Sequence, residues 1–213
     1  MSKPSFSSVI ANRGFRFLWI NQILIQLALN SLNFALIIWV FKLTNSIFAQ
    51  SALIISIYLP ALIFGILAGI FVDRSDRRKI IILIDLFFAL LIAAFILTKN
   101  YYPLILINAF LINSLFQFFI PAESSSIPLL LKKNLLFVAN SLFSLTLYSS
   151  LMIGFTLAGP MINFFGINSI FYFGAGSVLI AFLLAQGLPV LKVKAKKLKE
   201  STMELIIRET HQT

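Results

Sequence analysis

Long apolar runs alternate with short charged segments along most of this chain. Uncharged runs cover residues 17–41, 43–72, 100–122 and 134–191, and residues 80–98 are interrupted by Asp85 alone. Each run is long enough for the roughly 20 apolar residues that a helix needs to cross a bilayer. The pattern therefore predicts membrane-spanning helices.

The run over 134–191 is too long for one crossing, and turn-forming residues between Gly159 and Asn168 divide it. Six spans are therefore predicted, at residues 17–41, 48–72, 80–97, 103–120, 135–161 and 169–188. They form two triplets, 17–97 and 98–188, preceded by a cytoplasmic N-terminus over 1–16 and followed by a basic tail over 189–213. We expect Pro189 to end the last helix and the tail to begin a central linker, or else to lie as a helix on anionic lipid.

Composition and charge support this interpretation. Of the 213 residues, 60% are hydrophobic and 11% are charged, whereas charged residues make up roughly a quarter of ordinary soluble domains. The net charge of +10 could suggest nucleic acid, but with a cytoplasmic N-terminus every basic residue except Lys42 and Lys99 falls on the cytoplasmic side. That bias orients multi-pass membrane proteins, so we expect both termini in the cytoplasm and the chain in the cell membrane.

One loop carries the most informative motif. Residues 69–79 read G-I-F-V-D-R-S-D-R-R-K, between the second and third predicted spans. They resemble the G-x-x-x-D-R-x-x-R-R loop of the major facilitator superfamily, with Gly69, Asp73, Arg74, Arg77 and Arg78 at the matching positions. The resemblance implies a conformational latch that holds this loop against the other half of the transporter. For Arg77, Arg78 and Lys79, simple anchoring at the membrane surface is the alternative.

Further motifs resemble the drug, macrolide and siderophore efflux branch, which includes the enterobactin exporter. They are N-R-G-F-R-F-L-W-I-N-Q at 12–22, L-T-N-S at 43–46, L-P at 59–60, F-I-P-A-E-S-S-S-I-P at 119–128 and A-N-S-L at 139–142. Proton-driven exporters of the superfamily often carry G-x-x-x-G-P-x-x-G-G in helix five, of which Gly159 and Pro160 remain here. Phe155 stands where the first glycine of that motif would be.

The resemblance implies an all-α membrane protein whose six helices form one half, a 3+3 inverted repeat, of a major facilitator fold. It implies a secondary active transporter that exports small amphipathic compounds such as drugs, macrolides or siderophores by proton antiport and alternating access. Because the chain holds one bundle, we expect a truncated N-terminal half that needs a C-terminal half. A homodimer of half-size bundles, or a lysophospholipid transporter of the same superfamily, is the alternative.

Two acidic residues lie inside or beside predicted spans. Asp85 falls five residues into the third span, so we expect it to be shallow and to pair with a loop arginine, with proton carriage as the alternative. Glu123 closes the fourth span beside Pro121, where it could bind a cationic substrate or sit in the headgroup layer. Both are candidates for proton or charge coupling.

Amides recur at helical spacing in two spans. Gln22, Gln26, Asn30 and Asn33 share one face of the first span, and Asn113 and Gln117 repeat the four-residue step in the fourth. Amides in hydrocarbon are costly unless they are paired or hydrated. These six side chains are therefore predicted to line the substrate route, or to bond between helices.

Enzymatic motifs are missing from the sequence. The one histidine is in the terminal tail, there is no cysteine, and neither G-x-S-x-G nor H-E-x-x-H occurs. We therefore expect neither an enzyme, nor a cofactor, nor a metal site. The expected partners are the bilayer, a small substrate, protons and a second six-helix bundle.

Overall fold

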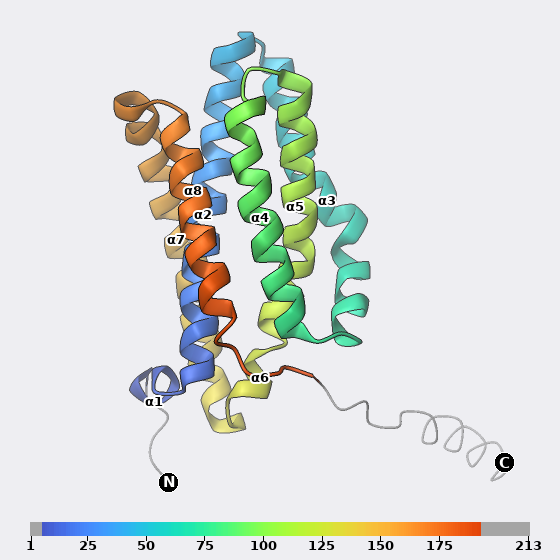
Figure 1. Cartoon of the computed structure of the whole chain (residues 1–213), viewed down its shortest axis with the longest axis vertical. Helices are drawn as coiled ribbons and strands as arrows, with labels where there is room; N and C mark the ends of the chain where they lie inside the picture. Colours follow the sequence, from blue (N-terminus) through green and yellow to red (C-terminus); the bar gives the residue numbers. More distant parts are fainter. Residues whose placement is uncertain (1–5, 193–213) are drawn as a thin grey trace, which may run out of the picture.

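The computed structural model describes residues 6–192, and this part of the chain is entirely helical, without strands (Figure 1). Its elements are α1 (Phe6–Ile10), α2 (Arg13–Thr44), α3 (Ile47–Asp73), α4 (Arg77–Thr98), α5 (Tyr102–Ser124), α6 (Ile127–Leu130), a short 3₁₀ helix η1 (Lys133–Leu135), α7 (Leu136–Phe165) and α8 (Asn168–Ala185). Six of them, α2, α3, α4, α5, α7 and α8, are long and apolar enough to cross a membrane. The predicted fold class is confirmed.

Local sequence signals set the helix boundaries. Asn12, Ser46 and Asp76 cap α2, α3 and α4, because each side chain accepts a bond from a backbone N–H of the first turn. Between α2 and α3, Asn45 has a φ of 49°. Asparagine tolerates this left-handed conformation better than most residues, and so it can stand where the related L-T-G-S turn has glycine.

Several boundaries differ from the sequence prediction. Helices α2, α4 and α7 are each longer than the spans predicted at 17–41, 80–97 and 135–161. Helix α5 continues through Pro121 to Ser124, beyond the predicted end at 120. Helix α8 ends at Ala185, so Pro189 follows the helix instead of ending it. The chain turns earlier at Gly187, where a Cβ atom would lie 2.8 Å from the ring of Phe17.

Helices of the first triplet pack mainly against helices of the second. Helix α3 packs chiefly on α5, α7 packs on α2, and α4 and α8 pack on each other. Helix α2 is the most buried of the six and α3 the least. The division into 3+3 repeats stays a prediction, and the predicted basic tail lies outside the described residues from 193 onward.

The connections fall into two groups. The α3–α4 loop and the α5–α7 connection lie at one end of the bundle, at the bottom of Figure 1, together with the start of α2 and the end of α8. We call this the charged end, since the loop with Asp73, Arg74, Arg77 and Arg78 lies there. The short turns α2–α3, α4–α5 and α7–α8 lie at the opposite end.

Candidate functional site

Two adjoining cavities lie between α2, α5 and α7, and the second is also lined by residues of α3. The first, toward the charged end, has a volume of about 360 Å³, and the second about 260 Å³. Both are lined by Gln26, Phe116 and Leu147, so they share a wall. Further lining residues of the first include Gln22, Glu123, Ile127, Asn140, Phe143 and Ser144.

All six predicted amides line these cavities. Gln22 and Gln26 line the first, and Gln26, Asn30, Asn33, Asn113 and Gln117 line the second. The structure thus brings together residues from α2 and α5 that lie some eighty positions apart in the sequence. Whether they contact a substrate stays a prediction.

Several of these amides also bond between helices, which was the alternative interpretation. Asn33 on α2 and Asn113 on α5 exchange hydrogen bonds of 3.2 and 3.3 Å through their side-chain amides. Gln22 donates to the carbonyl of Phe143 on α7 at 3.4 Å. Within the described residues, the Nδ2 atom of Asn30 and the Oε1 atom of Gln22 have no hydrogen-bond partner. A hydrogen-bond donor and an acceptor at the cavity wall are therefore unused.

Glu123 lies deeper than expected. Because α5 continues past Pro121, its side chain is 4% exposed and lines the first cavity. The side chain is therefore buried by protein, and the choice between a cation-binding role and a place in the headgroup layer stays a prediction. Its Oε1 atom has no hydrogen-bond partner among the described residues.

Asp85 is also buried, and no arginine among residues 6–192 forms an ion pair with it. Helix α4 begins at Arg77, so Asp85 lies eight residues in, about 12 Å along the axis at 1.5 Å per residue. It is fully buried and accepts a hydrogen bond from Asn21 on α2 at 2.6 Å. Asp85 thus lies farther along its helix than expected, because the helix starts earlier than the apolar run suggests. The predicted loop-arginine partner is wrong within the described residues, where Arg77 pairs with Asp73.

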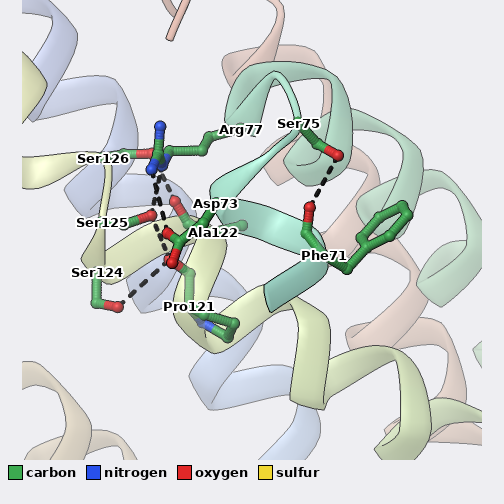
Figure 2. A network of polar contacts seen from close by, with 9 residues as sticks. All are labelled: Phe71, Asp73, Ser75, Arg77, Pro121, Ala122, Ser124, Ser125 and Ser126. Carbon is green, nitrogen blue, oxygen red and sulfur yellow. Dashed lines mark hydrogen bonds and ion pairs between the residues drawn. The ribbon is translucent and has the colours of Figure 1, made fainter. Parts of the chain in front are cut away.

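Arg77 ties the motif loop to the end of α5, as Figure 2 shows. It is 4% exposed, its Nε donates to Ser125 Oγ at 2.6 Å, and its Nη2 lies 3.4 Å from Asp73 Oδ1. Ser125 in turn donates to the carbonyl of Pro121 at 2.6 Å. Arg77 is therefore buried and links the motif loop to α5. A residue that only anchors the helix at the membrane surface would not need these contacts.

The other motif residues point elsewhere. Arg78 donates to the carbonyl of Gln186 at 2.7 Å, beside the C-terminus of α8, where a cation is favourable. The side chain of Asp73 is 73% exposed and Arg74 is exposed. A Cβ atom added to Gly69 would meet nothing within 4 Å. No helix of this bundle therefore occupies the space that Gly69 leaves open, and the latch stays a prediction.

The remaining glycine of the helix-five motif, Gly159, is also free of neighbours, in contrast to the nearby Gly154. A Cβ atom at Gly159 would meet nothing within 4 Å, whereas one at Gly154 would lie 2.9 Å from the Cβ of Asn30 and 3.0 Å from the backbone nitrogen of Ser31. Close approach of α7 to α2 thus depends on Gly154, one position before Phe155. Pro160 lies inside α7.

Sequence analysis missed other polar residues of the site. Asn21 holds Asp85, while Asn140 and Ser144 line the first cavity. Asn140 and Ser144 are four residues apart on α7, so the helical spacing used for α2 would have found them. Nothing in the pattern singles out Asn21, because its partner lies on another helix.

These observations define a class of protein. Six apolar helices surrounding amide-lined cavities are typical of a multi-pass membrane transporter. The sequence pattern of the Major Facilitator Superfamily matches residues 18–209. The chain therefore belongs to this superfamily of transporters.

A curated relative agrees with this assignment. The chain is 29% identical over 150 residues to "Uncharacterized MFS-type transporter YfiS" of Bacillus subtilis (strain 168). The match covers 70% of this chain and 36% of the relative. The chain thus corresponds to little more than a third of that protein, and the activity of a whole transporter is a matter for proposal.

Proposed function

We propose that this chain is one six-helix half of an exporter of small amphipathic compounds, such as drugs, macrolides or siderophores, in the cell membrane. The proposal rests chiefly on the paired cavities between α2, α5 and α7. Their walls combine amides with the rings of Phe34, Phe116 and Phe155. Mostly apolar walls with a few polar groups suit ligands that are partly polar and partly lipophilic.

A second six-helix bundle would complete the transporter, from a C-terminal half or from a second copy of the chain. Support comes from α3, on which Ala61, Gly65 and Gly69 are spaced by four residues. Added Cβ atoms at Gly65 and Gly69 would meet nothing within 4 Å. Small residues in a row let a neighbouring helix approach closely in membranes, so this face is suited to a partner bundle.

Proton antiport with alternating access is the proposed mode of transport. Asp85 and Glu123 are buried carboxyl groups within a membrane-spanning bundle, where acidic residues commonly serve proton relays. The motif loop, with both termini, is proposed to face the cytoplasm. Asp73 is exposed at the end of α3 and would meet the partner bundle as the two halves rock.

A lysophospholipid transporter is the second candidate. A fully apolar groove of about 360 Å³ lies on the bundle, lined by residues of α4 and α5, including Phe87, Leu91, Leu111 and Phe118. Such a groove is suited to an acyl chain. The two functions predict different cargo, and so a cargo assay separates them.

The test is export from cells that lack their own exporters, with a dye, a macrolide and a fluorescent lysophospholipid as cargo. Cells expressing the chain should accumulate less dye or macrolide, and a protonophore should abolish the difference. Gln26→Leu and Asn30→Leu should weaken export, while Asn108→Leu removes a buried amide of α5 that lines neither cavity and serves as the control. Equal accumulation of all three cargoes with and without the chain would contradict a transporter assembled from two copies of it, and the same result with a C-terminal six-helix half co-expressed would contradict the exporter proposal. A lysophospholipid-only effect would favour the second candidate.

A further inference from the structure

The wall of the first cavity contains a single charged side chain, that of Glu123. We propose that Glu123 binds the positively charged group of cationic amphipathic compounds, such as quaternary ammonium or phosphonium ions. The inference rests on the proposed function, because it names the substrate class of the same cavity.

Glu123 has no cationic partner within residues 6–192. The ion pair in this part of the chain joins Arg77 to Asp73, and Arg77 Nε donates to Ser125 instead of reaching Glu123. Glu123 is 4% exposed, and its Oε1 atom has no hydrogen-bond partner. Burial of an unpaired carboxylate is costly, so a cation that enters the cavity would offset a cost already present in the fold.

The rest of the wall also favours a cation. Phe116 and Phe143 line the same cavity as Glu123, and aromatic faces attract cations, more strongly when both are desolvated. Gln22, Gln26 and Asn140 provide amide oxygens. An anion would find no basic side chain in this wall and would be repelled by Glu123.

The space available sets the size of the ligand. The first cavity has about 360 Å³, near the lower end of the range for sites that hold drug-sized molecules. The second cavity, of about 260 Å³, adjoins it across Gln26, Phe116 and Leu147, so movement of these side chains would make room for a lipophilic body.

The experiment uses two probes of the same shape and opposite charge, tetraphenylphosphonium and tetraphenylborate. Their binding to the full 213-residue chain is measured by equilibrium dialysis in detergent. Wild type should prefer the phosphonium. Glu123→Gln should weaken phosphonium binding by at least about tenfold, as expected when one member of a buried charge pair is removed, and should leave borate binding equal or stronger.

Asp76→Asn is the matched control. It removes one negative charge outside the cavity, and asparagine can still cap α4 as Asp76 does. This variant should bind the phosphonium as wild type does. Glu123→Asp retains the charge and should keep most of the affinity.

A second measurement covers the case in which Glu123→Gln fails to fold. A carbodiimide that modifies buried carboxyl groups is applied to wild type, and modification at Glu123 is read by mass spectrometry. Phosphonium should protect Glu123, and borate should not.

The results separate two failures. Equal binding of both ions, unchanged phosphonium binding in Glu123→Gln, or absent protection would overturn the cation site while leaving the exporter proposal in place. Binding of neither ion by wild type would count against the exporter of amphipathic compounds as well.

Discussion

Asn21 Nδ2 on α2 donates to Asp85 Oδ2 on α4 at 2.6 Å and also lies 3.0 Å from the carbonyl oxygen of Ala181 on α8. Both side chains are fully buried. Asn21 is the hydrogen-bond donor that the described residues provide for this carboxyl group, whose Oδ1 atom has none. One amide therefore connects three helices through a buried acid.

Asn21→Ala should lower the stability of the bundle. Loss of the donor leaves a buried acid without a partner, at a cost of about 2–3 kcal/mol. For a chain of this size that corresponds to a fall of about 5–10 °C in Tm, measurable by differential scanning fluorimetry in detergent. The effect should shrink in a background of Asp85→Ala, because no acid is left to satisfy. Equal losses in both backgrounds would show that the contact itself contributes nothing.

Gly154→Ala and Gly159→Ala form a second test, on the same helix. The new Cβ at position 154 would lie 2.9 Å from Asn30 and 3.0 Å from the backbone of Ser31, so α7 must move away from α2. Overpacking of this kind costs about 1–3 kcal/mol. At position 159 the space is open, and alanine should be neutral or stabilising by up to about 1 kcal/mol. Equal Tm values for the two variants would contradict the close approach.

Sequence periodicity was sufficient to predict the six membrane-spanning helices and the amide side chains that line the cavities. Apolar runs of membrane length predict spans directly, because the bilayer sets the length. The amides of α2 and α5 repeat at helical spacing, and so Gln22 and Gln117 could be assigned to inward faces before any packing was known.

The depth of the acids could not be predicted in this way. Asp85 was assigned a shallow place because Arg77, Arg78 and Lys79 were counted as loop, whereas Arg77 begins α4. For Glu123 the sequence left both a cation-binding role and a place in the headgroup layer open, because the predicted span ends at residue 120. A proline is tolerated inside membrane helices, and α5 continues past Pro121 to Ser124. The two helix boundaries are local features, whereas the burial of both acids depends on packing against other helices.

Gly69→Leu should separate the fold of this bundle from its function. Nothing lies within 4 Å of the new Cβ, so Tm should be equal to or higher than that of wild type. If α3 docks against a partner bundle, the larger side chain should reduce export severalfold. Gly176→Leu on α8 is the control, because its Cβ also meets nothing within 4 Å. Unimpaired export by Gly69→Leu would contradict docking at this face.

Cysteine labelling should show which end of the bundle faces the cytoplasm. The chain contains no cysteine, so single substitutions can be read without background. Asn134 lies in the α5–α7 connection at the charged end, Asn100 lies in the α4–α5 turn at the opposite end, and both are exposed. Because basic residues favour the cytoplasmic side, a membrane-impermeant maleimide should label Asn100→Cys in intact cells and Asn134→Cys only after permeabilisation. The reverse pattern would place the motif loop outside the cell. Such a position would contradict the preference of arginine-rich loops for the cytoplasmic side. It would also remove the cytoplasmic entry to the cavity that contains Glu123, and with it the proposed direction of transport.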